Sequence, residues 1–291
     1  MEYSLKNNGN LRLAIQKKGR LSEKAVELLN NSGVEIENYA ERLSVSAAGF
    51  PLDVIFLRDD DIPEYVQDGV ADLGIVGEDV IAEKGSDLIV LKKLGFGKCR
   101  LMIAAPETLE INEAKDLAGK TIATSFPNIL ARFLDQEKIQ AKIVELSGSV
   151  EIAPSLGIAD LIFDIVSTGN TLRMNKLKKS FTVFESQAVL VTGRKNGIDK
   201  NLMENLLARI ESALTAKSSR YLMMNAPKNN LDKIMAELPS LKSPTVMPLA
   251  DPELVAVHAV VPKARFYELA QKLKDAGASG ILLLPIESMI P

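Results

Sequence analysis

The stretch DIVSTGNTL, residues 164–172, places an acid, three hydroxyls, a glycine and an amide directly after an apolar run. Backbone N–H groups and hydroxyls at such a strand-to-helix turn bind phosphate without a lysine. Gly169 lets the backbone approach an anion closely, and the Asp164 carboxylate can accept hydrogen bonds from sugar hydroxyls. A polar turn with a threonine helix cap explains the same spacing equally well. The first interpretation predicts a ribose 5-phosphate site formed by Asp164, Ser167, Thr168, Gly169, Asn170 and Thr171.

Three further candidate positions follow other apolar runs. In QKKGRLS, Lys17 and Arg20 can neutralise a polyphosphate, although a solvated turn has the same composition. In RDDDIP, Arg58 can meet an anion or stack on a base, and the three carboxylates are either solvated or in contact with Mg²⁺ through water. No protein metal cage is expected there. Ser125 precedes a helix in ATSFP and is a phosphate candidate or a plain cap.

Several classes of site are excluded. The chain has one histidine, His258, and one cysteine, Cys99, so a multi-histidine metal site and an internal disulfide are impossible. His258 lies in the alternating run LVAVHAVV and is expected in a strand, and Cys99 is expected to be a small buried hydrophobe. The segment GFGKCR lacks the third glycine of a dinucleotide motif, and no P-loop motif occurs.

Composition indicates a globular chain of more than one domain. It has 291 residues, of which 46% are hydrophobic and 25% charged. The net charge is −3 and no basic block occurs, so nucleic-acid binding is not expected. The start, MEYSLKNNGNLR, has no signal-peptide pattern, and no apolar run approaches the ~20 residues of a membrane helix. We therefore expect a cytoplasmic protein that does not enter a membrane.

Strand-like and helix-like runs alternate through the first two thirds of the chain, which predicts an α/β fold with mostly parallel sheets. The segment GVADL at residues 69–73 recurs as GIADL at 157–161, each time between a short helix and an apolar strand. The repeat predicts two similar lobes with a cleft between them. Because α/β connections are short, the chain from residue 183 onward can return to the first lobe and make it discontinuous.

The last third has a different order. Runs typical of strand, helix, strand, strand, helix and strand follow one another, and this βαββαβ order is that of a ferredoxin-like domain. The pattern predicts three domains. The first lobe covers residues 1–100 and 183–217, the second lobe covers 101–182, and the C-terminal domain covers 218–291.

Six segments together resemble the ATP phosphoribosyltransferase family, which catalyses the first step of histidine biosynthesis: QKKGRLS, RDDDIP, GVADLGIVGED, ATSFPN, GSVEIAPSLGIADLIFDIVSTGNTL and RYLMMNAP. The resemblance covers essentially the whole chain, and the C-terminal segment resembles the long, self-regulated form. It implies two lobes like those of periplasmic binding proteins and an ACT-like regulatory domain. It also implies transfer of phosphoribosyl from phosphoribosyl pyrophosphate to N1 of ATP, with Mg²⁺, releasing pyrophosphate.

The resemblance assigns the phosphoribosyl loop to Asp164 and residues 167–171, and the nucleotide side to Lys17, Arg20 and Arg58. It further implies feedback inhibition by histidine, AMP as another ligand, and homo-oligomers from dimer to hexamer. Thr245, at a strand start, can contact a bound amino acid, although a strand former in a strand explains it as well. The rivals are a different phosphoribosyltransferase and a two-lobed solute-binding or sensor protein without catalysis.

Overall fold

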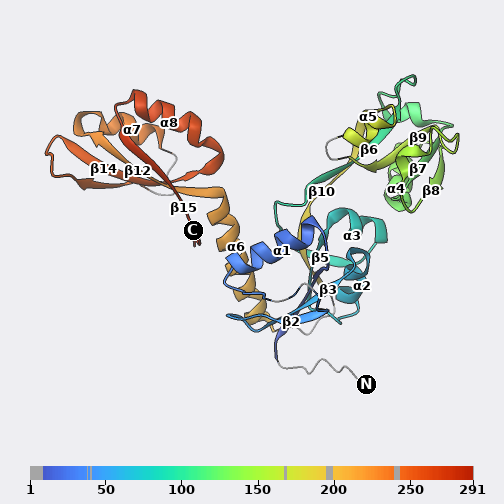
Figure 1. Cartoon of the computed structure of the whole chain (residues 1–291), viewed down its shortest axis with the longest axis horizontal. Coiled ribbons are helices and arrows are strands. Elements are labelled where there is room, and N and C mark those ends of the chain that lie inside the picture. Colours follow the sequence, from blue (N-terminus) through green and yellow to red (C-terminus); the bar gives the residue numbers. More distant parts are fainter. Residues whose placement is uncertain are drawn as a thin grey trace. The chain divides into compact units, whose positions relative to one another are not determined.

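The computed structural model describes residues 9–37, 39, 41–166, 169–194, 199–238 and 243–290 (Figure 1). They form three sheets, of six, five and four strands. By contacts, the chain divides into two compact units. The first contains the six- and five-stranded sheets, and the second contains residues 27–35 and the chain from Asp199 onward. No helix in the described ranges is both long and apolar enough to cross a membrane.

Lobe I is built on the six-stranded sheet, in the order β2-β3-β1-β4-β11-β5. Its strands are β1 (Leu11–Gln16), β2 (Ser44–Ser46), β3 (Leu52–Leu57), β4 (Leu73–Gly77), β5 (Leu88–Lys93) and β11 (Ala188–Gly193). Its helices are α1 (Arg20–Asn31), α2 (Ile62–Gln67) and α3 (Glu78–Lys84), with a 3-10 turn at Asp59–Asp61. Asp61 stands at the N-cap position of α2, but its side chain makes no capping hydrogen bond.

Lobe II is built on the five-stranded sheet, in the order β10-β6-β9-β7-β8. Its strands are β6 (Cys99–Pro106), β7 (Thr121–Thr124), β8 (Lys142–Glu145), β9 (Leu161–Ile165) and β10 (Leu177–Ser186). Its helices are α4 (Pro127–Glu137) and α5 (Asn170–Met174), with 3-10 turns at Ala114–Leu117 and Val150–Ile152. The short helix expected before the GIADL segment is wrong: of VEIAPSLG, residues 150–157, only the first three form a 3-10 turn, and Pro154 cannot donate a backbone hydrogen bond.

The two lobes share one topology, as the repeated sequence predicts. The strand order β3-β1-β4-β11-β5 of lobe I matches β8-β7-β9-β6-β10 of lobe II position by position. In each lobe the first three of these strands are parallel, and the fourth runs antiparallel to its neighbour. The fifth strand, β5 or β10, is antiparallel to the fourth and so runs in the same direction as the first three. The sheets are therefore mostly parallel, as predicted, with β11 or β6 reversed and β2 antiparallel at the edge of lobe I. The reversed strand is the one that enters its sheet just after the chain has crossed between the lobes.

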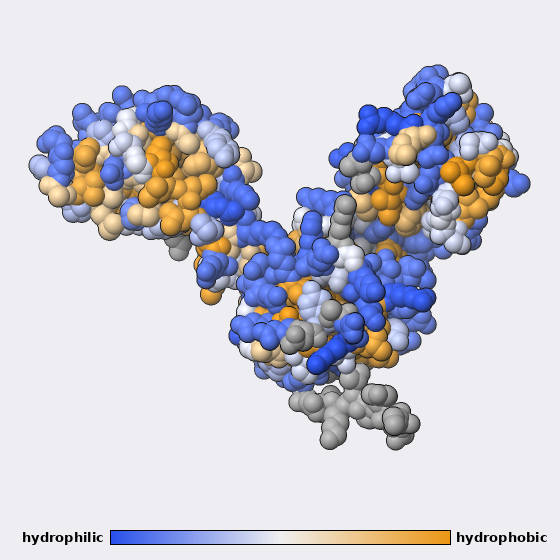
Figure 2. Space-filling model, in the orientation of Figure 1, coloured by the Kyte–Doolittle hydropathy of each residue, from blue (hydrophilic) through white to orange (hydrophobic). Residues whose placement is uncertain are grey.

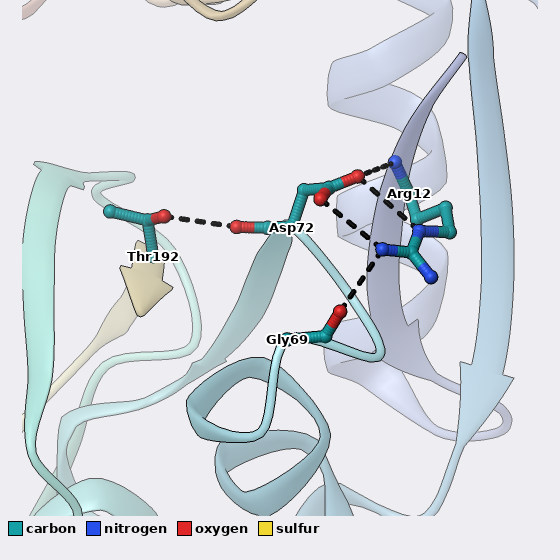
Figure 3. Close-up of polar contacts among 4 residues, drawn as sticks. All are labelled: Arg12, Gly69, Asp72 and Thr192. Carbon is teal, nitrogen blue, oxygen red and sulfur yellow. Dashed lines mark hydrogen bonds and ion pairs between the residues drawn. The ribbon is translucent and has the colours of Figure 1, made fainter. Parts of the chain in front are cut away.

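Figure 3 shows what the repeated GVADL segment does in lobe I. The Asp72 carboxylate accepts the Arg12 N–H at 2.7 Å. The N–H of Asp72 in turn donates to the Arg12 carbonyl at 2.9 Å. The Arg12 guanidinium also contacts this carboxylate and the Gly69 carbonyl, and the Thr192 hydroxyl donates to the Asp72 carbonyl at 2.9 Å. These contacts join the amino end of β1 to β4 and β11.

The corresponding GIADL segment makes the same pair of hydrogen bonds in lobe II. The N–H of Asp160 donates to the Thr121 carbonyl at 2.8 Å, and the Asp160 carboxylate accepts the Thr121 N–H at 2.8 Å. Both aspartates therefore lie at the amino ends of the central strands, at the edge opposite the candidate site residues. The repeated segment thus has the same structural role in each lobe: its aspartate joins the amino ends of two neighbouring strands, β1 and β4 in lobe I and β7 and β9 in lobe II.

The C-terminal segment has the predicted βαββαβ order and a ferredoxin-like sheet. Helix α6 (Lys200–Ser218) leads into it, and the Asp199 carboxylate caps that helix by accepting the N–H groups of Asn201 and Leu202. The sheet order is β13-β14-β12-β15, with α7 and α8 against a shared apolar cluster on one face. The elements are β12 (Ser219–Pro227), α7 (Leu231–Glu237), β13 (Thr245–Pro248), β14 (Leu254–Pro262), α8 (Phe266–Asp275) and β15 (Ser279–Pro285).

Candidate functional site

The candidate residues lie at the carboxyl ends of parallel strands, where open α/β sheets bind ligands. Lys17 directly follows β1 and Arg58 directly follows β3. These strands are paired in register up to Gln16 and Leu57, and the Lys17 N–H donates to the Leu57 carbonyl at 2.8 Å. The fold therefore brings Lys17 and Arg58 to one edge of lobe I, next to each other.

Lys17 and Arg58 are the accessible cations of that edge. Lys17 is half-buried and Arg58 is exposed, and within the described ranges neither side chain forms an ion pair. Arg58 occupies the N-cap position of the following 3-10 turn, and its guanidinium, which carries only donors, cannot cap that turn. Arg20 begins α1, and its side chain lies outside the described atoms.

In lobe II, Asp164 lies one residue before the end of β9, opposite Met102 of β6. Burial raises the pKa of the Asp164 carboxyl above its ordinary value, the hydrogen bond from the Ile165 N–H lowers it, and the negative charge of Glu151 raises it further. The Ile165 nitrogen lies 2.7 Å from Oδ1 of Asp164. A partly desolvated carboxylate beside a second acid favours a ligand that brings hydrogen-bond donors or a cation.

The glycine of the candidate loop has the backbone conformation that its proposed role needs. Gly169 has φ 81° and stands at the start of α5, which is a single turn containing Asn170 and Thr171. Both of those residues are exposed, and the Asn170 amide oxygen accepts a hydrogen bond from Arg173. Ser167 and Thr168 lie outside the described residues. The described part of the loop is therefore open and polar.

Lys179, on β10, is a candidate that sequence analysis missed. An ideal Cβ added to Gly169 would lie 2.5 Å from Lys179 Cε and 3.0 Å from its Nζ, so the ammonium group lies directly against the loop. The sequence KLKKSFT indicates an exposed alternating strand and gives no sign of which lysine faces the loop. Glu151 was missed for a similar reason, since its proximity to Asp164 depends on how the segment after β8 turns.

Ser125 follows β7, at the position in lobe II that corresponds to Lys17 in lobe I. Its hydroxyl donates to the Leu146 carbonyl at 2.7 Å. The first free N–H groups of α4, at Asn128 and Ile129, donate to the carboxylate of Glu83. Phosphate binding at Ser125 stays a prediction, and it would require the Ser125 hydroxyl to leave the Leu146 carbonyl.

Thr245 begins β13, as expected, and is exposed opposite His258 of β14. The Tyr221 hydroxyl lies 2.9 Å from His258 Nδ1, and the two rings meet edge to face at 5.7 Å. His258 thus has the structural role that its alternating sequence predicts. Tyr221, His258 and Thr245 lie on strands β12, β14 and β13 of the C-terminal sheet.

The described residues contain no group of three or more His, Cys, Asp or Glu side chains able to hold a metal ion. Asp164 and Glu151 form a pair only. A magnesium ion usually takes one or two protein carboxylates together with the phosphates of its substrate. The donor set in lobe II fits a cation of that kind, delivered with a phosphorylated ligand.

Comparisons with known proteins identify the family of this chain. The family model for ATP phosphoribosyltransferase (HisG) matches residues 58–212, and the model for the HisG C-terminal domain matches residues 216–288. The curated ATP phosphoribosyltransferase of Bacteroides thetaiotaomicron is 49% identical over 282 residues, covering 96% of this chain and 99% of that protein. That of Cytophaga hutchinsonii is 48% identical over 281 residues, covering 96% and 98%.

Among solved structures, the ATP phosphoribosyl transferase (HisG:HisZ) complex from Thermotoga maritima contains a similar chain. It has a TM-score of 0.58 and 35% identity, and the match covers 69% of this chain and 98% of that one. Two family models and two relatives that match over nearly their full length point to the same activity. The chain belongs to the ATP phosphoribosyltransferase family of histidine biosynthesis.

Proposed function

We propose that this enzyme transfers the phosphoribosyl group of phosphoribosyl pyrophosphate to N1 of ATP, with lobe II holding the phosphoribosyl group and lobe I the nucleotide. Family membership supports the reaction. The shared topology of the lobes is the observation that supports placing one substrate on each lobe. The carboxyl-end edge of the lobe II sheet bears Asp164 and the glycine loop, at the end of β9, and the same edge of the lobe I sheet bears the cations Lys17 and Arg58, after β1 and β3.

In lobe II, the Asp164 carboxylate would accept hydrogen bonds from the ribose hydroxyls. The loop at residues 167–171 would hold the 5-phosphate through backbone N–H groups and hydroxyls, with the Lys179 ammonium beside it. In lobe I, Lys17 and Arg58 would contact the phosphates or base of ATP, together with Arg20. Ser125 stays a further phosphate candidate.

The reaction makes few demands on acid–base groups. Adenine N1 carries no proton to remove, and displacement at the anomeric carbon passes through an oxocarbenium-like state, so no strong general base is needed. The work consists of orienting two anionic substrates and stabilising the pyrophosphate that leaves. Bound Mg²⁺ would supply charge neutralisation of the pyrophosphate. Asp164 and Glu151 are the residues that would hold it beside the substrate.

Regulation and assembly belong to the C-terminal domain in this proposal. Histidine, as the end product, would bind near Thr245 and inhibit by favouring one global state over another, and AMP would be a further ligand.

The sheet face that bears Tyr221 also exposes apolar side chains, and Figure 2 shows apolar residues gathered on this domain. Leu282 is 57% exposed and Leu284 is 40% exposed, which supports contact between copies in a dimer or hexamer. The cytoplasmic location stays a prediction.

The test mixes the purified protein with ATP, phosphoribosyl pyrophosphate, Mg²⁺ and pyrophosphatase, and follows the ultraviolet absorbance of the N1-substituted adenine with and without histidine. We expect product in the absence of histidine and less product as histidine is added. Product that is insensitive to histidine contradicts the regulatory role alone. If phosphoribosyl pyrophosphate binds but no product forms, the acceptor is a different molecule. If neither substrate binds, the solute-binding alternative replaces the enzyme.

A further inference from the structure

Helix α3 belongs to lobe I but packs against lobe II. It follows β4, the central strand of the lobe I sheet, and precedes β5 of the same sheet. Ala82, in its second half, packs against the apolar cluster of lobe II that contains Leu130 and Leu134 of α4. A helix contributed by one lobe therefore completes part of the packing of the other.

The residue after Ala82 caps a helix that has no cap of its own. Helix α4 begins after Phe126, whose side chain cannot accept a hydrogen bond, so the N–H groups of its first turn lack a local acceptor. The Glu83 carboxylate accepts the Asn128 N–H at 2.8 Å and the Ile129 N–H at 2.9 Å. These are the groups that an N-cap side chain normally satisfies, and a negative charge is favourable there.

The exchange between the two helices is reciprocal. The Asn128 side-chain amide donates to the Glu83 carbonyl at 3.0 Å, and the Arg132 guanidinium donates to the Ala82 carbonyl. Both carbonyls belong to the last turn of α3. The C-terminal end of a lobe I helix and the N-terminal end of a lobe II helix thus satisfy each other across the two lobes.

The other end of α3 is fixed where the chain returns from lobe II. The buried Asp79 donates its N–H to the Ser186 hydroxyl oxygen at 3.0 Å, and its carboxylate accepts the Ser186 hydroxyl at 2.6 Å. Ser186 ends β10, two residues before β11 begins in lobe I. A Cβ on Gly77 would lie 2.1 Å from the Asp79 carboxylate, so glycine leaves the room that this contact needs.

We propose that α3 is a strut that fixes the angle between the lobes and that Glu83 is a positioning residue for the transfer reaction. One end of α3 is bonded to Ser186, where the chain passes from β10 to β11, and the other end is bonded to α4. Lobe II therefore cannot rotate relative to lobe I unless the Glu83 contacts break. The positioning role rests on the proposed function, because it requires that the two substrates are held on different lobes. The strut itself does not depend on that assignment.

The test measures the interlobe distance and the kinetics of Glu83→Ala, with Glu83→Gln as a milder variant that keeps one acceptor oxygen. Glu137→Ala is the matched control, because Glu137 is exposed at the far end of the same α4. In a Cys99→Ala background, which removes the native thiol, spin labels attached through Glu64→Cys in lobe I and Lys142→Cys in lobe II, both exposed positions, report the distance by pulsed EPR without substrates. Dilution with unlabelled protein isolates the pair within one chain.

We expect one narrow distance distribution for the parent and for Glu137→Ala, and a broad one for Glu83→Ala. Loss of positioning should lower kcat/KM for both substrates roughly 10- to 100-fold, with part of the loss in kcat at saturation, and Glu83→Gln should be intermediate. A distribution as narrow as the parent's overturns the strut, whatever the activity. A broad distribution with unchanged kcat/KM overturns the positioning role. If the parent itself makes no product, the proposed function fails while the distance measurement still decides the strut.

Discussion

Replacing Gly169 by alanine tests the phosphoribosyl loop with a small change. Gly169 has φ 81°, where a residue with a Cβ is strained by about 1–2 kcal/mol. The added Cβ would also lie 2.5 Å from Lys179 Cε, so the lysine must move away from the loop. That movement costs little, because the side chain is flexible and exposed. We expect the free energy of unfolding to fall by about 1 kcal/mol, which lowers Tm by roughly 2–4 °C.

The larger effect should be on substrate binding. If Lys179 and the loop hold the 5-phosphate, displacement of the ammonium removes one charge-assisted hydrogen bond, worth roughly 1.5–3 kcal/mol. We therefore expect KM for phosphoribosyl pyrophosphate to rise about 10- to 100-fold while KM for ATP changes little. Steady-state kinetics with each substrate varied, and calorimetric titration of phosphoribosyl pyrophosphate, measure this.

Gly157→Ala is the matched control in the same lobe. Gly157 has φ 70°, but no heavy atom lies within 4 Å of its added Cβ, so the variant carries the strain without the displacement. Both variants should lose similar stability, and only Gly169→Ala should lose substrate affinity. Equal rises of KM in the two variants, or no rise in Gly169→Ala, would refute the assignment of the loop.

Three other perturbations have expected outcomes. The pKa of Asp164 is raised in the folded protein, so ionisation of Asp164 destabilises the fold as pH rises through that pKa. Asp164→Asn should therefore raise Tm at pH 7 and lose this gain in acid, which melting curves at several pH values measure. The same variant should abolish phosphoribosyl pyrophosphate binding, which calorimetric titration measures. Arg58→Ala should raise KM for ATP with Tm unchanged, since the side chain is exposed without an ion pair in the described ranges; kinetics and melting decide this. Asp160→Ala should cost roughly 1–3 kcal/mol in denaturant unfolding through its lost bond to Thr121, while the folded enzyme keeps both KM values.

Much of the fold follows from local sequence. The alternating apolar runs and the repeated GVADL and GIADL segments predict the α/β lobes and the βαββαβ order, and the structure confirms them. Strand direction is different. Nothing in the run that forms β6 or β11 specifies that it enters its sheet antiparallel, because direction depends on where the chain crosses between lobes. The division into three domains at the stated boundaries stays a prediction.

The candidate site shows the same division between local and distant information. Strand ends followed by charge or hydroxyls predict Lys17, Arg58 and Asp164 as candidates, since the carboxyl ends of parallel strands share one edge. Lys179 and Glu83 could not be found in this way. Lys179 lies ten residues after Gly169, and Glu83 lies 45 residues before Asn128. Each reaches its partner through the register of a strand or the packing of a helix, which the neighbouring residues in sequence do not reveal.

The return of β11 to the lobe I sheet, after the chain has passed through lobe II, also constrains the order in which the protein can fold during synthesis on the ribosome. Lobe I is made first, but β11 lies in its sheet between β4 and β5, and β11 ends at Gly193. Until that residue has left the ribosome, β5 has no neighbour in the sheet, so the sheet of lobe I is completed only after all of lobe II has been synthesised. The emerging chain therefore exposes an unpaired apolar strand edge on β4 during this interval, the kind of edge that chaperones protect from aggregation.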